Sequence, residues 1–422
     1  MLLQFNVSNF MSIKDEVCFS AFANAGTDHS DRLINVKGKR ILPSLAFYGA
    51  NAAGKSNLFK ALSAAIVLVR NSGDLQVNSA TGIVPFLMDK DSRNKPTSMD
   101  FIFIHNGIEY EYGFKADSRT VYEEYLYKYT SAKPSMVFER TNIDTYKFTV
   151  ETKRELEPLK ARNTANKLFL STATKWNSTF TKDAFLWFAE EIDTYDSRSI
   201  NDAQYLEYLD KRNNSAKTKA FLLSMLKHAE INIEDYDFES KTAEDISIPL
   251  PSGIMLDQSV LEKIKKSAKL FRLSAIHSVN NSGNTEYYDI DFNLESNGTK
   301  MVFAYGPIIE EALEKGRTIV IDELDNSLHP SLTRYLVNLF NDMSVNVNGA
   351  QLIFNTHDIS LLDLDIFRRD QIYFVEKKNN AQTDVYSLAD FSPRKGEKVQ
   401  RGYLQGRYGA IPFVVGGIEW EA

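Results

Sequence analysis

A segment of ten residues, Phe47 to Ser56, holds side chains of the types that bind phosphate groups. It contains a glycine, four residues and then Gly-Lys-Ser, and it follows directly on an apolar run that begins at Leu42. Glycine permits backbone angles that a Cβ atom forbids, so successive N–H groups can close around an oxyanion. A lysine in this position reaches the β- and γ-phosphates, and the serine hydroxyl ligates Mg²⁺. The pattern therefore predicts a nucleotide site, in which Lys55 is also a catalytic residue.

The flanks of this segment favour a phosphate-binding loop over a chance match in a glycine turn. The preceding apolar run is typical of a buried strand, and residues 57–62 carry apolar side chains at helical spacing. The N-terminus of such a helix adds partial positive charge, which stabilises a bound phosphate. The predicted nucleotide-binding residues of the loop are Gly49, Asn51, Ala52, Ala53, Gly54, Lys55, Ser56 and Asn57.

Two acidic residues end a second run of strand-forming residues, which extends from Thr318 to Glu323. In phosphate-loop ATPases, a strand in this position delivers an aspartate to Mg²⁺ and a glutamate to the attacking water. We therefore predict that Asp322 and Ser56 hold the metal ion and that Glu323 is the general base. The alternative is a strand that ends in solvated acids without a role in chemistry.

Three weaker patterns accompany these two. Asp325 follows the acidic strand, and His357 lies at the end of another apolar run that begins at Gln351. Upstream, Ser296 is a good N-cap for a helix, and Gly298 permits close approach of the backbone to an anion. For His357 the alternative is a histidine satisfied by its neighbours at a strand end.

The rest of the chain must position these residues. Residues 1–22 alternate apolar and polar side chains and predict two strands at the edge of a sheet. Further alternating runs, separated by turn-forming pairs such as Asn106-Gly107, predict an antiparallel meander that residues 137–150 extend. The meander strands are expected at Met99–Ile104, Glu109–Phe114 and Val121–Tyr129.

These patterns predict an α/β fold in three parts. Residues 1–150 and 271–422 are the two halves of a nucleotide-binding domain, and residues 151–270 are a mostly helical insertion. The insertion has no sustained heptads, so a long coiled coil is not expected. Helices are expected at Ala184–Ile192, Tyr205–His228 and Val260–Leu270, and strands follow at Phe271–Val279 and Tyr287–Leu294.

Composition excludes several classes of protein. The chain of 422 residues is long enough for two or three domains, and its 43% hydrophobic and 25% charged residues are those of a globular protein. The single cysteine, Cys18, excludes an internal disulfide framework and a cysteine-based zinc cluster. No apolar run approaches the ~20 residues of a membrane helix, and the start lacks a signal-peptide pattern, so a cytoplasmic protein without membrane partners is expected. The net charge of −7 argues against a globally basic nucleic-acid binder but leaves a local basic groove open.

The combination of motifs resembles the ABC-type ATPases of the SMC and RecF class. It resembles more closely the OLD-like ATPases that bacteria often encode in phage-resistance loci. The motifs that carry this resemblance are the opening Asn9-Phe10-x-Ser12, the signature Glu295-Ser296-x-Gly298-Thr299, the run Asp322-Glu323-x-Asp325-x-x-Leu328-His329-Pro330 and the tail Tyr403-x-x-Gly406-Arg407-Tyr408-Gly409-Ala410-Ile411-Pro412. The first and last of these bracket nearly the whole chain.

This resemblance implies an ABC/SMC-type P-loop ATPase head with ATP and Mg²⁺ as cofactors. It implies that Ser296 and Gly298 form the signature motif, that Asp325 is the D-loop acid and that His357 is the catalytic switch histidine. In such proteins ATP lies between two heads, so the phosphate loop of one copy faces the signature of the other. ATP would then favour a head-to-head dimer or higher oligomer, because the signature helix offers N–H donors to the γ-phosphate.

The sequence departs from the family pattern in some places. Pro307 falls within the expected signature helix and should kink or shorten it. The glutamine that completes the Mg²⁺ shell is not assigned, although Gln76 is available, and the residue that recognises the base is also unassigned. The choice of ATP over GTP rests on the resemblance and on the absence of an Asn-Lys-x-Asp motif.

The last 50 residues raise the question of a nuclease. OLD nucleases carry a C-terminal TOPRIM domain, and Gln371–Glu376 is similar to its first strand, but no Asp-x-Asp follows. We therefore interpret this run as the last strand of the ATPase sheet. The stretch Arg401–Gly409 is a candidate docking surface, and its alternative is a terminal loop packed on the fold.

The sequence leads to three functional hypotheses. The first is an ATP-hydrolysing subunit of an anti-phage, abortive-infection system that controls a separately encoded effector of TOPRIM or other nuclease type. The second is an SMC- or RecF-like DNA repair or maintenance ATPase that binds DNA directly, which leaves nucleic acid open as a partner. The third is a nucleotide-gated scaffold with negligible hydrolysis.

Overall fold

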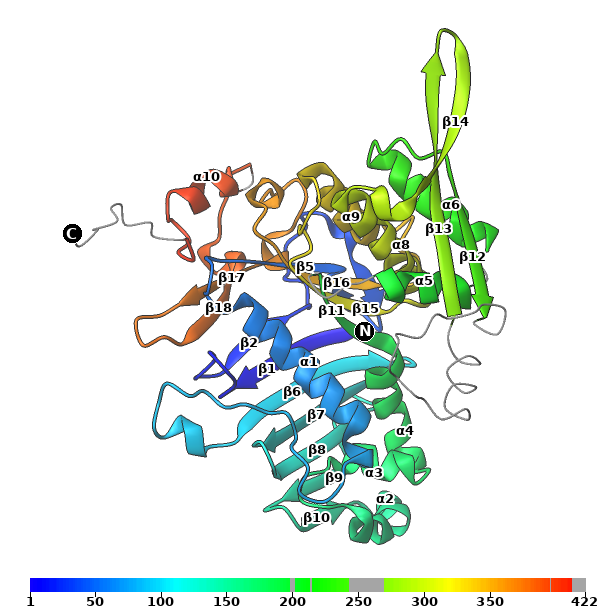
Figure 1. The fold of residues 1–422 in the computed structure, drawn as a ribbon. Helices are drawn as coiled ribbons and strands as arrows, with labels where there is room; N and C mark the ends of the chain where they lie inside the picture. Colours follow the sequence, from blue (N-terminus) through cyan, green and yellow to red (C-terminus); the bar gives the residue numbers. More distant parts are fainter. Residues whose placement is uncertain (198–201, 213–214, 243–268, 395, 412–422) are drawn as a thin grey trace, which may run out of the picture. The chain divides into compact units, whose positions relative to one another are not determined.

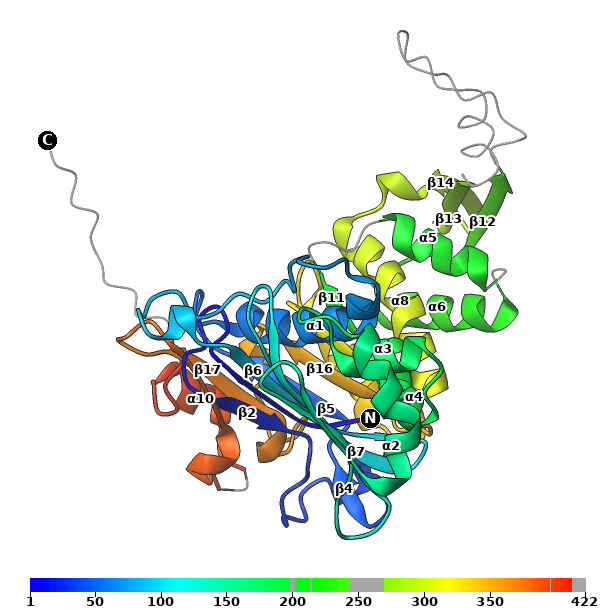
Figure 2. The same cartoon turned by 90° about the horizontal axis from the view of Figure 1, so that it is seen from below.

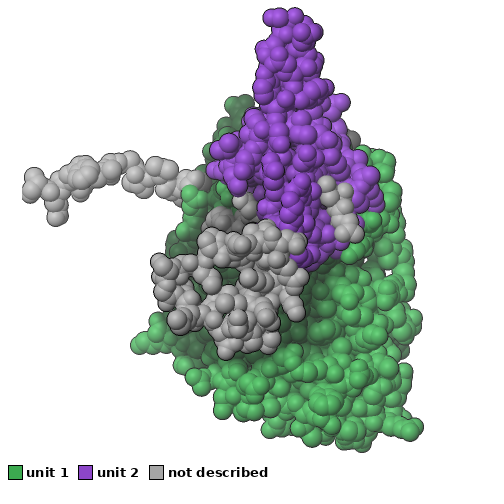
Figure 3. Space-filling model, turned by 45° about the vertical axis from the view of Figure 1, so that its right-hand side comes forward, with its two compact units in different colours: residues 1–198, 312–326, 336–422 green, residues 199–311, 327–335 purple. Residues whose placement is uncertain are grey.

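The computed structural model describes residues 1–197, 202–212, 215–242, 269–394 and 396–411. The chain forms two compact units, which Figure 3 shows in different colours. Unit 1 comprises residues 1–198, 312–326 and 336–422, and unit 2 comprises residues 199–311 and 327–335. The long helices α8 (Asn297–Lys315) and α9 (Pro330–Asn341) both begin in unit 2 and end in unit 1.

The core of unit 1 is a six-stranded sheet in the order β11-β15-β16-β5-β17-β18 (Figure 1). Its first five strands are parallel, and β18 pairs antiparallel with β17 at one edge. Every residue of β5, β15 and β16 is buried, as expected for strands covered on both faces. The strands are β5 (Ser44–Tyr48), β11 (Ile192–Asp196), β15 (Thr318–Asp322), β16 (Gln351–Asn355), β17 (Ile372–Lys377) and β18 (Thr383–Ser387). Because parallel strands end at the same edge, the residues after β5, β15 and β16 meet there.

Helix α1 (Lys55–Asn71) begins directly after the glycine loop that follows β5. It buries Leu58, Leu62, Ile66 and Val69, which recur at helical spacing on one face. Its carboxyl-terminal half contacts α3 (Phe169–Lys175), and Figure 2 shows the two helices side by side. The strand–loop–helix order predicted around the phosphate loop is therefore confirmed.

The second sheet of unit 1 is antiparallel, with seven strands in the order β10-β9-β8-β7-β6-β1-β2. These strands are β1 (Leu2–Ser8), β2 (Val17–Ser20), β6 (Thr97–His105), β7 (Ile108–Ala116), β8 (Val121–Tyr129), β9 (Ser135–Thr141) and β10 (Thr145–Phe148). Asn106 and Gly107 both have positive φ, which suits the tight turn between β6 and β7. The predicted α/β fold with an antiparallel meander is confirmed.

The two sheets of unit 1 share one hydrophobic core. Phe19 of β2 and Phe47 of β5 have ring centroids 5.3 Å apart, and Phe47 also meets Phe59 of α1 at 5.6 Å. Smaller elements complete the unit: β3 (Ile34–Val36), β4 (Lys39–Ile41), α2 (Val150–Leu156), α4 (Thr179–Leu186) and α10 (Val399–Leu404). The phosphate loop is thus anchored on both sides by a large apolar core.

Unit 2 packs helices on a three-stranded antiparallel sheet in the order β12-β13-β14. Phe303 of α8 lies at the centre of its core, with ring centroids 4.8 Å from Phe292, 5.0 Å from Tyr236 and 5.7 Å from Tyr205. The remaining elements are α5 (Asp202–Lys211), α6 (Ala216–His228), β12 (Asp235–Thr242), β13 (Lys269–Asn281) and β14 (Asn284–Asp291). The strands expected at Phe271–Val279 and Tyr287–Leu294 correspond to β13 and β14, although β14 starts and ends three residues earlier than expected.

The division into units differs from the predicted insertion, residues 151–270. Residues 151–197 belong to unit 1, because Ile192–Asp196 pairs as a parallel strand with β15. The helix expected at Ala184–Ile192 is confirmed as far as Glu191, as the end of α4 followed by a π-helical turn over Trp187–Glu191, and Ile192 already begins β11. The helix expected at Val260–Leu270 lies outside the described residues up to position 268. The strand β11 has only five residues and follows directly on a helical turn. Its apolar pattern is therefore too short to distinguish it from the end of that helix.

Helix α8 continues past Pro307 to Lys315, so the proline does not shorten it as expected. Phe303 and Ile309, on either side of the proline, are both buried. Their burial stabilises the helix and offsets the loss of the one backbone hydrogen bond that Pro307 cannot donate.

Candidate functional site

The phosphate loop adopts a backbone suited to binding an anion. Ala52 and Gly54 have positive φ angles of 61° and 111°, whereas φ of Ala53 between them is not positive. Alternation of this kind directs successive N–H groups into one concave surface, which is a known anion site. The loop predicted from Gly-x-x-x-x-Gly-Lys-Ser is therefore preformed.

Glycine is required at both glycine positions of the loop. A Cβ atom on Gly49 would lie 2.2 Å from the carbonyl oxygen of Val375 in β17, and one on Gly54 would lie 2.0 Å from Oγ1 of Thr383. Backbone and side-chain atoms of neighbouring strands thus fill the space behind the loop. This close packing fixes the loop against the core sheet.

Lys55 is buried at the start of α1, and its ammonium group points back over the loop. Its Nζ donates to the carbonyl oxygens of Gly49 at 2.7 Å and Ala50 at 3.3 Å. Burial lowers the pKa of Lys55, and the nearby carboxylates of Asp322, Glu323 and Asp325 act in the opposite direction. The two carbonyl oxygens are neutral acceptors. A phosphate group bound in the loop would give the ammonium group of Lys55 an anionic acceptor, which forms a stronger hydrogen bond.

Ser56 and Asp322 are far apart in the sequence but close together in the fold. Ser56 Oγ donates to Oδ1 of Asp322 at 3.1 Å. Two neighbouring oxygens in an octahedral Mg²⁺ shell are about 3 Å apart, since each lies about 2.1 Å from the ion. Among the described residues no group of three or more His, Cys, Asp or Glu side chains is placed to hold a metal. The Ser56 and Asp322 pair therefore fits Mg²⁺ that takes its other ligands from phosphate and water.

Glu323 follows Asp322 at the end of β15 with a left-handed backbone, φ 58°. Such a conformation costs a non-glycine residue about 1–3 kcal/mol unless its surroundings stabilise it, and it is common at active sites. Here the Glu323 amide donates to Oδ1 of Asn355 at 2.8 Å. The predicted general base is thus held at the same edge of the sheet as Lys55.

His357 and Asp325 also lie at this edge, joined through the backbone. The amide of His357 donates to the carboxylate of Asp325, with distances of 3.1 and 3.3 Å to its two oxygens. Burial, together with the positive charge of Lys55, lowers the pKa of His357, against the opposite effect of the nearby acids. His357 and Asn51 line the same cavity of about 320 Å³ beside the loop. Five predicted residues, Lys55, Ser56, Asp322, Glu323 and His357, therefore converge at one edge of one sheet.

The opening motif Asn9-Phe10-x-Ser12 supports the phosphate loop from behind. Ser12 Oγ accepts a hydrogen bond from Asn57 Nδ2 at 2.8 Å and lies 2.8 Å from Oγ1 of Thr383. Thr383 Oγ1 also donates to the carbonyl oxygen of Ala53 at 2.9 Å. The side chain of Asn57, predicted to bind nucleotide, thus has a protein partner in the N-terminal turn. Sequence singled out Ser12 only as part of a family motif, and it gave no signal for Thr383.

Asn355, at the end of β16, is a site residue that the sequence prediction missed. It is completely buried, and its side chain contacts both acids at the end of β15. A polar side chain at the end of the buried run Gln351–Asn355 is the one sequence signal that could have identified it.

The predicted signature residues, Ser296 and Gly298, lie in unit 2. Ser296 Oγ accepts from the Thr299 amide at 3.1 Å, which confirms its N-cap role for α8. A Cβ atom on Gly298 would lie 3.1 Å from the carbonyl oxygen of Ser327, so the first turn of α8 packs closely on this neighbouring turn. Both residues line a cavity of about 630 Å³ within unit 2, together with His329.

Two other suggestions from the sequence do not fit. Gln76 lies beyond the carboxyl end of α1, a helix of 17 residues that spans about 25 Å from the loop, so it cannot complete the Mg²⁺ shell. The aromatic residues of the Arg401–Gly409 stretch do not form a docking surface, since Tyr403 and Tyr408 are buried. They stack on Phe374 of β17 with centroids 5.4 and 5.7 Å away. The alternative, a terminal segment packed on the fold, is correct for these residues.

The strand Gln371–Glu376, compared with a TOPRIM strand, belongs to the six-stranded core sheet of unit 1. It forms β17, which pairs parallel with β5. It is not the last strand, because β18 follows and occupies the edge.

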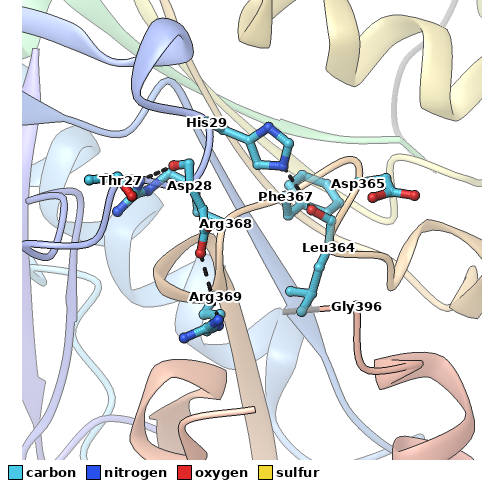
Figure 4. Close-up of a pocket in the computed structure, with 9 residues that line it drawn as sticks. All are labelled: Thr27, Asp28, His29, Leu364, Asp365, Phe367, Arg368, Arg369 and Gly396. Carbon is cyan, nitrogen blue, oxygen red and sulfur yellow. Dashed lines mark hydrogen bonds and ion pairs between the residues drawn. The ribbon is translucent and has the colours of Figure 1, made fainter. Parts of the chain in front are cut away.

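A separate cavity of about 220 Å³ lies at the opposite, amino edge of the core sheet (Figure 4). His29 points at the carbonyl oxygen of Leu364, and the guanidinium of Arg368 binds both oxygens of Asp370 at 2.9 Å. Arg368 also donates to three backbone carbonyl oxygens of residues 24–28. The hydrogen-bond donors of Arg368 are thus used to hold the loop at residues 24–28. Ligands of parallel α/β sheets bind at the carboxyl edge, so this cavity is not the candidate site.

Comparisons with known proteins bear on the fold of this site. Residues 44–363 match the family described as "AAA domain, putative AbiEii toxin, Type IV TA system". No curated protein sequence matches the chain.

No helix in the described part of the chain is both long and apolar enough to cross a membrane.

Two solved structures illustrate the similarity found among known folds. The SMC head domain from Thermotoga maritima is 12% identical, with a TM-score of 0.41 over 92% of this chain and 98% of that chain. The Smc head domain with an extended coiled coil, bound to the C-terminal domain of ScpA, from Pyrococcus furiosus is 12% identical, with a TM-score of 0.39 over 93% and 97%.

Proposed function

The chain belongs to the AAA-domain family that its residues 44–363 match, and from this premise we propose that it binds and hydrolyses ATP with Mg²⁺. The observation that carries the proposal is the convergence at one sheet edge of Lys55, Ser56, Asp322, Glu323 and His357. The loop, the lysine and the two acids are the parts that phosphoryl-transfer enzymes use.

The chain's own residues have distinct roles in this proposal. The N–H groups of the loop and Lys55 bind and orient the phosphates, while Ser56 and Asp322 hold Mg²⁺, which neutralises phosphate charge when bound. Glu323 accepts a proton from the attacking water at its carboxylate. Burial and the charge of Lys55 lower the pKa of His357, which favours the neutral imidazole, and its ring N–H donates a hydrogen bond to an oxygen of the γ-phosphate.

We further propose that two copies share each nucleotide. The capped N-terminus of α8, with Ser296 and Gly298, offers the partial positive charge of a helix terminus to phosphate. In the proposal this terminus of one copy closes on the loop of another, so ATP favours a dimer or higher oligomer. Asp325, bound to the backbone of His357, would transmit closure to the switch residue.

The biological role that we propose is control of a separate effector, a nuclease or toxin, in a bacterial anti-phage system. Support comes from the family description, which names a toxin of a toxin–antitoxin system, and from the OLD-like motifs. The alternative is an SMC- or RecF-like ATPase that acts on DNA directly. That function predicts salt-sensitive DNA binding that changes with ATP.

Glu323→Gln tests the catalytic proposal. The substitution removes the proton acceptor but keeps the size of the side chain, so turnover is expected to fall about 10²- to 10⁴-fold while ATP still binds. ATP-bound oligomer should accumulate, as measured by sedimentation velocity with and without ATP. The control is Glu397→Gln, in the loop before α10. Turnover and oligomer unchanged in Glu323→Gln would favour a nucleotide-gated scaffold instead.

Co-purification tests the biological role. The chain is expressed with the protein encoded beside it, with ATP, with ADP and without nucleotide. A complex that depends on nucleotide is expected. Failure to form a complex under all three conditions, combined with ATP-dependent binding of duplex DNA, would favour the repair function.

A further inference from the structure

Asn355 connects the three strands that carry the site. It is the last residue of β16, which lies between β15 and β5 in the core sheet. The backbone around it is paired on both sides: Leu324 donates to the carbonyl oxygen of Asn355 at 3.1 Å, and Thr356 donates to that of Phe47 at 3.1 Å. Its side chain is therefore fixed within the sheet and directed at the end of β15.

The side chain of Asn355 uses both of its polar atoms on the two acids. Its Nδ2 donates to Oδ1 of Asp322, the oxygen that also accepts from Ser56. Its Oδ1 accepts from the amide of Glu323 at 2.8 Å. Of the side chains this small, only an amide offers a fixed donor and a fixed acceptor at the same time.

These two hydrogen bonds act on different requirements of the site. The first orients the Asp322 carboxylate beside the Ser56 hydroxyl, the pair that would hold the metal ion. The second compensates the left-handed backbone of Glu323, where a non-glycine residue is strained. Without it, the amide of Glu323 would lose this hydrogen bond, and the backbone could relax to a more common conformation.

We propose that Asn355 is a positioning residue that fixes the metal-binding carboxylate of Asp322 and the backbone of Glu323 at once. The proposal rests on the proposed function, since it assigns Asn355 to the same site. Outer partners of metal ligands typically contribute about 10- to 100-fold to metal affinity or activity. Asn355 acts through its two neighbours and does not touch the nucleotide.

Asn341 provides a matched control within the same unit. It is also buried, and its side chain accepts from Ser44 at 2.8 Å and from Gln371 at 3.2 Å. Ser44 and Gln371 lie at the amino ends of β5 and β17, on the edge of the sheet away from the phosphate loop. Loss of Asn341 therefore removes a buried hydrogen-bond network of similar size without touching the site.

The experiment compares Asn355→Leu, Asn355→Thr and Asn341→Leu with the unchanged chain. Three quantities are measured: kcat and KM for ATP, the affinity for Mn²⁺ in the presence of ADP by electron paramagnetic resonance, and the affinity for ADP in EDTA. For Asn355→Leu, kcat is expected to fall about 10- to 100-fold and Mn²⁺ to bind about tenfold more weakly. ADP affinity in EDTA should stay within about twofold, because Lys55 and the loop are untouched.

Asn355→Thr provides a second test of the same residue if Asn355→Leu does not fold. Its hydroxyl can make one of the two hydrogen bonds, so the same pattern with a smaller loss is expected. Asn341→Leu should lower the melting temperature but leave kcat and Mn²⁺ affinity of the folded protein unchanged.

The outcomes separate this proposal from the proposed function. An unchanged chain that does not hydrolyse ATP would overturn the proposed function itself. If it does hydrolyse ATP, but Asn355→Leu and Asn355→Thr keep normal kcat or normal Mn²⁺ affinity, only the role of Asn355 is overturned. Equal losses in Asn341→Leu would also overturn it, because they would indicate general damage to the sheet.

Discussion

In unit 1, the residues at the phosphate edge are joined by hydrogen bonds between segments far apart in the chain, such as Ser56 and Asp322, which are 266 positions apart. In unit 2, the turn at Ser296 is held by bonds within four residues, from Thr299 and Lys300. The first arrangement exists only when the whole core sheet is assembled. The hydrogen bonds of the second are local, although the turn also packs on the neighbouring turn at Ser327.

This difference suits two different roles for the two sets of residues. A site built from distant segments is rigid and suits the positioning of phosphate, metal and water. A locally formed turn depends less on distant contacts, which would suit the approach to a nucleotide of another copy that we propose. Three substitutions test this contrast, and they are given in order of decreasing expected effect.

The largest effect is expected from Phe303→Ala, which removes the centre of the unit 2 core. A buried Phe→Ala change costs about 3–5 kcal/mol, so residues 202–212, 215–242 and 269–311 should lose protection in hydrogen exchange measured by mass spectrometry. ADP affinity should persist, because the phosphate edge lies in unit 1. The matched control is Phe101→Ala in β6, which should show the reverse pattern. Parallel loss of ADP binding in Phe303→Ala would show that the two units are not independent.

A smaller effect is expected from Lys55→Ala, which tests the rigid edge alone. Hydrogen bonds to charged groups contribute about 1.5–3 kcal/mol, so ADP affinity should fall about 10- to 150-fold by titration calorimetry. Lys60→Ala, an exposed residue on the same helix, is the control and should bind normally. Normal ADP affinity in Lys55→Ala would remove the lysine from the phosphate site.

The smallest effect is expected from Ser296→Ala, which tests the local turn. Loss of an N-cap costs about 0.5–2 kcal/mol, so exchange of the Thr299 amide should accelerate, while ADP affinity of the monomer stays unchanged. Ser296→Asp keeps the cap but adds a negative charge, so it should preserve slow exchange and yet reduce ATP-dependent assembly. Normal assembly in Ser296→Asp would argue against contact between this turn and the nucleotide phosphate.

The sequence predicted much of unit 1 because its signals are local. The loop from Gly49 to Ser56 has a spacing set by backbone geometry, and the meander strands alternate with period two. The same reasoning failed where the signal is not local. β11 is a short strand whose only distinguishing feature is its partner β15, and the glutamine of the Mg²⁺ shell stays unassigned because no local pattern marks it.

The residue types available for phosphate and metal can be read from the sequence, because motif spacing and hydrophobic period follow from the covalent geometry of the chain. Three features required the folded chain: Asn355 joins Asp322 to Glu323, Thr383 fills the space behind Gly54, and Tyr403 and Tyr408 are buried. These are contacts between segments distant in sequence. Their existence depends on which strands lie side by side, and that order is set by the packing of the whole core.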